Sequence, residues 1–164
     1  MSSTTKKALI QRFDRDNLYG WLNISTYVTA TGIEILTQAG AHIVVPYEEI
    51  KLVCFVREFE AQDPGERRVF TSRPKTPGLW VRFRFKDNDL MEGLLPNDLL
   101  GQEAYGFSFT PPDAGSNTQR VFVPKAALES LQVLAVMGSQ PRRPQRQTKP
   151  VPKEQISLFD VENG

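Results

Sequence analysis

Few residues of this sequence have the type and spacing that catalysis requires. The single histidine, His42, and the single cysteine, Cys54, are the residues best suited to a base and nucleophile pair. Cys54 lies inside the apolar run "IKLVCFV", which favours a buried thiol that packs as a small hydrophobic group. His42 has no cysteine or histidine neighbour at the spacing that zinc sites use.

The remaining catalytic patterns are missing as well. Asp87 and Asp89 fall in a polar turn, where contact with solvent accounts for both carboxylates. The sequence contains no P-loop, no dinucleotide fingerprint and no nucleophile elbow. We therefore expect a protein that is not an enzyme and that uses neither a metal ion nor a cofactor.

A second group of residues could bind nucleic acid. The segment "ERRVFTSRPK" interleaves basic residues with an aromatic one, and the strand predicted after it carries two more arginines on one face. Cations neutralise phosphates and aromatic rings stack on bases. We favour the simpler interpretation of a charged linker and an exposed strand face, neutralised by the acids of "REFEAQDPGE". The candidate nucleic-acid contacts are Arg67, Arg68, Phe70, Arg73, Lys75, Arg82 and Arg84.

The C-terminal segment combines a basic, proline-rich stretch, "QPRRPQRQTKPVPK", with the apolar "QISLF". The stretch has almost no apolar residue, which predicts a disordered and extended tail. Apolar side chains at its end predict either a segment that docks back on the folded domain or a linear motif that binds a partner. The basic residues of the tail are Arg142, Arg143, Arg146, Lys149 and Lys153.

"QISLF" is similar to the bacterial sliding-clamp-binding motif, Gln-x-Ser/Asp-Leu-Phe, through which polymerases and repair proteins dock on the replication clamp. The matching residues are Gln155, Ile156, Ser157, Leu158 and Phe159. The resemblance implies that Leu158 and Phe159 enter an apolar pocket of the DNA sliding clamp. It implies further that the Gln155 amide sets the register through hydrogen bonds.

The elements that would carry these residues repeat one pattern in the two halves of the chain. In "LWVRFRF" apolar and basic residues alternate with the period of a half-buried strand. "DRDN" and "KDND" predict tight turns, and "HIVVP" and "RVFVP" predict strands that end at proline. The predicted matches are Phe13 with Phe85, Leu18 with Leu90, Gly20 with Gly93 after an insertion at Glu92, Gly32 with Gly106, and Val45-Pro46 with Val123-Pro124.

Five short strands per repeat that close on themselves give a small barrel. We predict an all-β protein with two tandem five-stranded barrels from an internal duplication, at residues 6–57 and 78–137. Residues 58–77 form a linker and residues 138–164 the disordered tail. The order resembles Sm-like and SH3-like small barrels. Asn23 and Ser25 in "LNISTYVTATG" give a weaker resemblance to the PilZ family, which implies a receptor for cyclic di-nucleotides as an alternative function.

Composition sets the remaining expectations. Hydrophobic content of 40% and a net charge of +1 are typical of a globular domain and not of a polybasic nucleic-acid binder. One cysteine predicts a reducing compartment, and neither a signal peptide nor a membrane span is visible. We expect a cytoplasmic adaptor of DNA replication or repair, whose tail docks on the clamp while the barrels contact nucleic acid or a second protein. A purely structural interaction module is a further alternative.

Overall fold

The computed structural model describes residues 4–60 and 68–138, and the elements within them confirm the predicted all-β class. Each half of the chain has five strands, and a short 3-10 helix precedes the last one. The first half contains β1 (Thr5–Arg12), β2 (Leu18–Asn23), β3 (Gly32–Thr37), β4 (His42–Pro46), η1 (Tyr47–Glu49) and β5 (Ile50–Val56). The second half contains β6 (Gly78–Phe85), β7 (Leu90–Leu95), η2 (Leu99–Gly101), β8 (Gly106–Phe109), β9 (Thr118–Pro124), η3 (Lys125–Ala127) and β10 (Leu128–Met137). No helix in these two ranges is long and apolar enough to cross a membrane.

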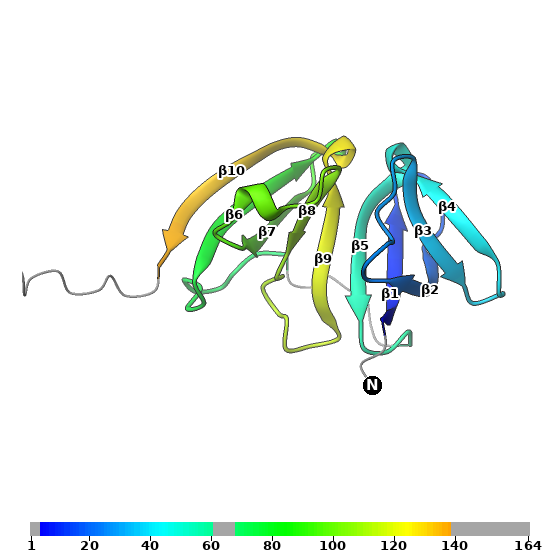
Figure 1. Cartoon of the computed structure of the whole chain (residues 1–164). Helices are drawn as coiled ribbons and strands as arrows, with labels where there is room; N and C mark the ends of the chain where they lie inside the picture. The colour runs from blue at the N-terminus through cyan, green and yellow to red at the C-terminus, as the bar shows by residue number, and fades with distance from the viewer. Residues whose placement is uncertain (1–3, 61–67, 139–164) are drawn as a thin grey trace, which may run out of the picture.

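The strands form a seven-stranded sheet of order β4-β3-β2-β1-β5-β9-β8 and a three-stranded sheet of order β10-β6-β7. An isolated bridge between Leu94 and Thr110 connects the end of β7 to the chain that follows β8. Strands β5 and β9 pair across the middle of the molecule and join the two halves (Figure 1). Among the described residues, β4 does not pair with β5, nor β9 with β10, so both hydrogen-bonded sheets are open.

The pairing register of β1 with β2 agrees with that of β6 with β7. Ala8 of β1 lies opposite Gly20, and Val81 of β6 lies opposite Gly93. Ile10 lies opposite Leu18 in the same way that Phe83 lies opposite Met91. The two glycines therefore correspond without an insertion at Glu92. The predicted matches of Leu18 with Leu90 and of Phe13 with Phe85 are each wrong by one residue, because the pairing places Met91 at the position of Leu18 and Arg12 at the position of Phe85.

Glycine is required where β3 and β8 approach the strands that follow them. Gly32 lies opposite Pro46, and Gly106 lies opposite Pro124. A Cβ atom would stand 2.0 Å from the Val45 carbonyl oxygen at Gly32 and 2.3 Å from the Val123 carbonyl oxygen at Gly106. Any side chain at either position would collide with the backbone of the neighbouring strand.

Two hydrophobic cores lie on opposite faces of β1 and β5. Ile10 and Val53 belong to the core of the first half, which also takes in Phe122 from β9. Leu9 and Cys54 face the other way and belong to the core of the second half. The predicted burial of Cys54 is confirmed, since only 1% of the residue is exposed. Each half thus completes the core of the other.

Candidate functional site

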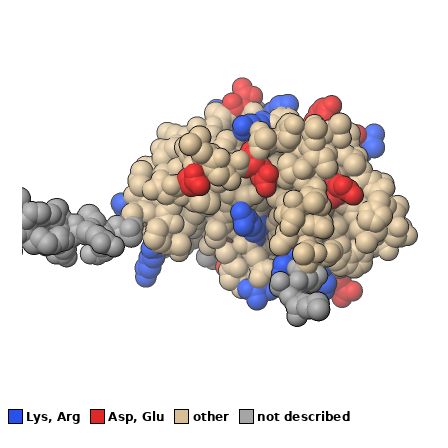
Figure 2. All heavy atoms as spheres, in the orientation of Figure 1, with Lys and Arg blue, Asp and Glu red and all other residues tan. Residues whose placement is uncertain are grey.

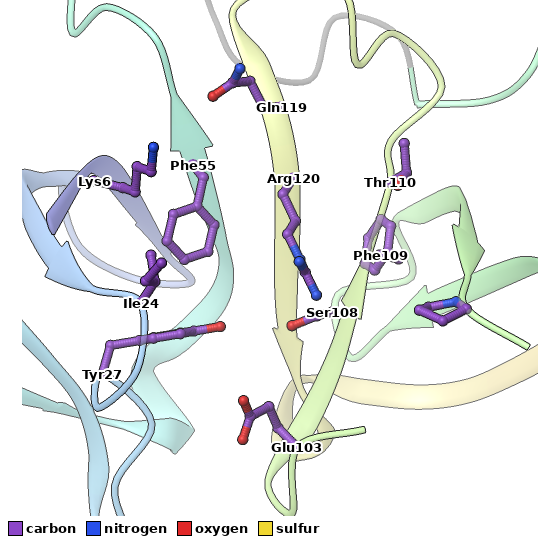
Figure 3. Close-up of a pocket in the computed structure, with 11 residues that line it drawn as sticks. Lys6, Ile24, Tyr27, Phe55, Glu103, Ser108, Phe109, Thr110, Gln119 and Arg120 are labelled. Atoms are coloured by element: carbon purple, nitrogen blue, oxygen red, sulfur yellow. The ribbon is translucent and has the colours of Figure 1, made fainter. Parts of the chain in front are cut away.

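A cleft of about 620 Å³ lies along the junction of β5 and β9. Phe55 of β5 lies opposite Arg120 of β9, and both side chains line the cleft (Figure 3). Because the two strands come from different halves, the site exists only where the halves are joined. Its lining residues are Lys6, Ile24, Tyr27, Phe55, Pro96, Glu103, Ser108, Phe109, Thr110, Gln119 and Arg120.

Tyr27 forms the floor between the halves. It follows the turn after β2, and its ring packs edge-on against Phe55 and Phe122, with ring centroids 5.4 Å and 5.8 Å apart. Burial raises the pKa of Tyr27 above its ordinary value of 10.0, and a side-chain hydrogen bond with Ser108 offsets part of that rise. The phenol is therefore neutral at physiological pH and serves as a hydrogen-bonding group rather than as a base.

Two exposed cations and one acid surround this aromatic floor. Lys6 enters from β1, Arg120 from β9, and Glu103 from the loop before β8 (Figure 3). Gln119 and Thr110 add neutral polar groups at the same rim. The arrangement suits a ligand that combines a negative charge with a flat apolar part, because cations neutralise the charge and rings contact the plane.

Two of the predicted nucleic-acid contacts, Arg68 and Arg82, pair with acidic residues of the second half. Register places Arg82 of β6 opposite Glu92 of β7, and the Arg82 Nη2 atom lies 2.9 Å from the Glu92 Oε2 atom. Arg68 Nη1 lies 3.4 Å from Asp89 Oδ2, and Arg84 Nη2 donates to Asn88 Oδ1 over 3.1 Å. The acids that pair with Arg68 and Arg82 belong to β7 and its turn, while Asp63 and Glu66 of the predicted linker acids lie outside the described residues.

Other members of that predicted group lie around the same strands. Phe70 packs edge-on against Trp80 with ring centroids 6.0 Å apart, so its ring contributes to structure. Arg73 and Lys75 are exposed in the segment that leads into β6, while Arg67 lies outside the described residues. Figure 2 shows acidic and basic side chains interspersed on the visible face, without a continuous basic surface.

Glu92 is a buried carboxylate that sequence reasoning missed. Only 3% of the residue is exposed, and it accepts hydrogen bonds from the Phe70 backbone, the Trp80 indole and the Arg82 guanidinium. Burial by itself raises the pKa of Glu92, but these donors outweigh burial and the net pKa lies below the ordinary value of 4.5. Glu92 therefore fixes the segment before β6 onto the β6–β7 hairpin.

Stability should depend on the charge of Glu92. Because the folded-state pKa is lowered, the stabilisation is present above the unfolded pKa and is lost as pH falls through the folded value. We expect Glu92→Gln to reduce the free energy of unfolding at pH 7 by about 2 kcal/mol and to flatten its decline under acid. Urea denaturation between pH 3 and 7 measures both effects, with the exposed Glu60→Gln as control. An unchanged acid profile in Glu92→Gln would contradict this assignment.

Asp87 and Asp89 are not simply solvated, as the sequence suggested. The Lys51 ammonium of β5 lies 2.7 Å from Asp87 Oδ2 and 2.9 Å from Asp89 Oδ2. Partial burial raises the pKa of each carboxyl, but hydrogen bonds with Lys51 contribute to a net lowering of both. The three residues form an ionic contact between the first half and the β6–β7 turn.

The other predicted site residues have simpler outcomes. His42 is exposed at the start of β4. No group of three or more potential metal ligands occurs among the residues that the structure describes. Asn23 accepts a hydrogen bond from the Ser25 backbone over 2.9 Å, so this pair stabilises a local turn. Two sets lie outside the described residues: the motif Gln155, Ile156, Ser157, Leu158 and Phe159, and the basic Arg142, Arg143, Arg146, Lys149 and Lys153.

Searches of curated proteins and of solved structures returned no match to this chain. A protein-family model described as "Family of unknown function (DUF6982)" matches residues 4–135, which run from β1 into β10 and do not include the C-terminal motif. The chain therefore belongs to the DUF6982 family of unknown function.

Proposed function

We propose that this protein is a non-enzymatic adaptor that docks on the DNA sliding clamp through its C-terminal segment, in DNA replication or repair. The body, in this proposal, consists of two small-barrel modules that arose by internal duplication. The same number of strands along the chain in each half, and the matching registers of β1 with β2 and of β6 with β7, support the duplication. The cleft between the halves is available for a second partner.

One observation carries the proposal: every specified position of the clamp-binding motif is filled, at Gln155, Ser157, Leu158 and Phe159. The motif begins after β10 ends at Met137, and the intervening chain can span at most roughly 60 Å. This length allows the motif to enter a pocket on another protein while the body remains outside it. Five basic residues lie in between and would add a salt-dependent attraction to DNA near the clamp.

In this proposal the cleft, rather than the group around Arg82, is the better surface for nucleic acid or a protein partner. Arg82 is held by Glu92, whereas Arg120 and Lys6 are exposed at the cleft. Aromatic side chains stand next to those two cations, as Tyr27 and Phe55. A backbone phosphate at Arg120 with a base against the aromatic floor would use both kinds of contact.

Loss of the apolar pair should strongly weaken clamp binding. We expect the full chain to bind a bacterial sliding clamp with micromolar affinity, because a short motif loses part of its contact energy to ordering. Leu158→Ala/Phe159→Ala should weaken binding by about 100-fold and Gln155→Ala by about tenfold. Isothermal titration calorimetry measures the affinities, and the melting temperature of each variant is recorded beside them.

Leu100→Ala provides the matched control, because Leu100 is an apolar residue that is 98% exposed and lies far from the motif in sequence. It should bind the clamp as the wild type does. If the wild type does not bind and the double variant loses thermal stability, the segment packs on its own fold and the proposal fails.

The cleft favours one second candidate, a receptor for a small anionic ligand such as a cyclic di-nucleotide. Its cations and aromatic rings suit a nucleotide, although Asn23 and Ser25, on which the PilZ resemblance rests, are engaged in their own turn. Calorimetric titration with cyclic di-nucleotides, comparing the wild type with Arg120→Ala, separates this function from clamp docking.

A further inference from the structure

The two outermost strands of the molecule each have an unused edge. Among the described residues, β4 pairs only with β3, and β10 pairs only with β6. The two strands lie at opposite ends of the molecule in Figure 1. An unpaired edge presents backbone donors and acceptors that can pair with another strand.

The internal junction shows how such edges fit together in this protein. It joins β5, the last strand of the first half, to β9, the fourth strand of the second half. In the second half, β10 corresponds to β5 of the first half, since each strand follows a 3-10 turn after a proline. Strand β4 likewise occupies the place of β9, since each ends at that proline. The two free edges, on β10 and β4, therefore belong to the strands that correspond to β5 and β9, which pair in the junction.

Apolar residues are exposed on these edges where the junction buries their counterparts. Ile43 and Val44 of β4 are 37% and 46% exposed, and Val133 of β10 is 49% exposed. In the junction, Val121 and Phe122 take the places of Ile43 and Val44 and are 0% exposed. Phe55 takes the place of Val133 and is 8% exposed. Association through both edges would bury all three residues.

We propose that copies of this chain associate head to tail, with β10 of one copy paired antiparallel to β4 of the next. The junction register, in which Val53 faces Phe122 and Phe55 faces Arg120, sets the register between copies. Leu131 then faces Val44, and Val133 faces His42. The contact is heterologous, so each copy uses one edge for each neighbour, and assemblies grow or close into rings.

Charge makes this contact weaker than the internal junction. Lys51 of β5 binds Asp87 and Asp89 across the junction, but Glu129 occupies its place in β10. In the first half, Asp14 and Asp16 correspond to those two aspartates, and Arg15 lies between them in the sequence. Pairing between copies thus brings Glu129 toward two acids, so association should be reversible and depend on protein concentration.

Sedimentation velocity of the full chain over a range of concentrations tests the proposal. The wild type should show concentration-dependent association. Val44→Lys and Val133→Lys should each reduce it to a monomer, because every contact needs one edge of each kind and each variant lacks one of them on all copies. An equimolar mixture of the double-edge variant Ile43→Lys/Val44→Lys with Val133→Lys should form dimers and nothing larger, since only one complementary pair of edges remains. All these residues are exposed, so the variants should keep the wild-type melting temperature.

Glu129→Lys provides a gain-of-function test. By restoring the charge of Lys51, it should strengthen association by about tenfold, whereas the control Glu60→Lys should leave association unchanged. A monomeric wild type together with a monomeric Glu129→Lys variant would overturn the proposal. Association that persists when the β4 edge carries both lysines would also overturn it, since the copies would then not use that edge. Association seen only in Leu158→Ala/Phe159→Ala would mean that the C-terminal segment of the chain itself covers an edge, and would overturn it as well.

Discussion

Phe122→Ala should lower the free energy of unfolding by about 4 kcal/mol, which is a large share of the roughly 5 to 15 kcal/mol that stabilises an ordinary domain. Phe122 belongs to β9 in the second half, yet its fully buried ring packs in the core of the first half against Tyr27. Its loss should leave a cavity at the centre of the molecule. Because each half completes the core of the other, both should unfold in one transition.

Urea denaturation monitored by tryptophan fluorescence measures the unfolding midpoint of each half separately. Trp21 reports on β2 and Trp80 on β6, so Trp21→Phe and Trp80→Phe each leave one reporter. Both reporters should show the same lowered midpoint in the Phe122→Ala background. The exposed Leu100→Ala should change stability by less than about 0.5 kcal/mol. Separate midpoints for the two reporters would show that the halves fold independently.

Gly32→Ala and Gly106→Ala should each destabilise the protein by about 3 kcal/mol. In both cases the new methyl group would enter the space of a backbone carbonyl, 2.0 Å away at Val45 and 2.3 Å away at Val123. A backbone atom cannot move aside as a flexible side chain can, so the strand pair must separate. The gain from a less flexible unfolded chain, about 0.4 to 1 kcal/mol, is too small to compensate.

Gly115→Ala is the matched control, because a Cβ atom at Gly115 would meet nothing within 4 Å. Thermal denaturation of the three variants should show two large losses and one near-zero change. If only one of Gly32→Ala and Gly106→Ala destabilised the protein, the two halves would not use the same backbone approach. Similar losses support the view that the halves are copies of one module.

The elements of this fold were predictable because their signals are local. The alternation of apolar and polar residues in "LWVRFRF" predicted β6. The prolines of "HIVVP" and "RVFVP" predicted where β4 and β9 end. The glycines Gly32 and Gly106 were correctly matched because the spacing to the following proline strand is set within one repeat. The match of Leu18 with Leu90 failed because residues of a turn can be shifted by one position without changing the apolar pattern.

The junction between the halves was not predictable, because it depends on which strands meet in three dimensions. Nothing in "RVFVP" distinguishes a strand that pairs with β5 from one with a free edge, although Phe122 is fully buried and Val44 is 46% exposed. The cleft at Arg120 was missed for the same reason. The pairing of Arg82 with Glu92 could have been predicted more easily, since the register of the β6–β7 hairpin alone places Glu92 opposite Arg82.

Docking of the C-terminal segment on the sliding clamp is tested most directly by competition. A fluorescent peptide with the sequence of residues 151–164 is bound to a bacterial clamp, and unlabelled full chain is added while fluorescence anisotropy is measured. The wild type should displace the peptide at micromolar concentration, and Leu158→Ala/Phe159→Ala should require about 100-fold more protein. If the peptide does not bind under conditions where an established clamp-binding peptide does, or if both proteins displace it equally, the clamp is not the partner of this motif.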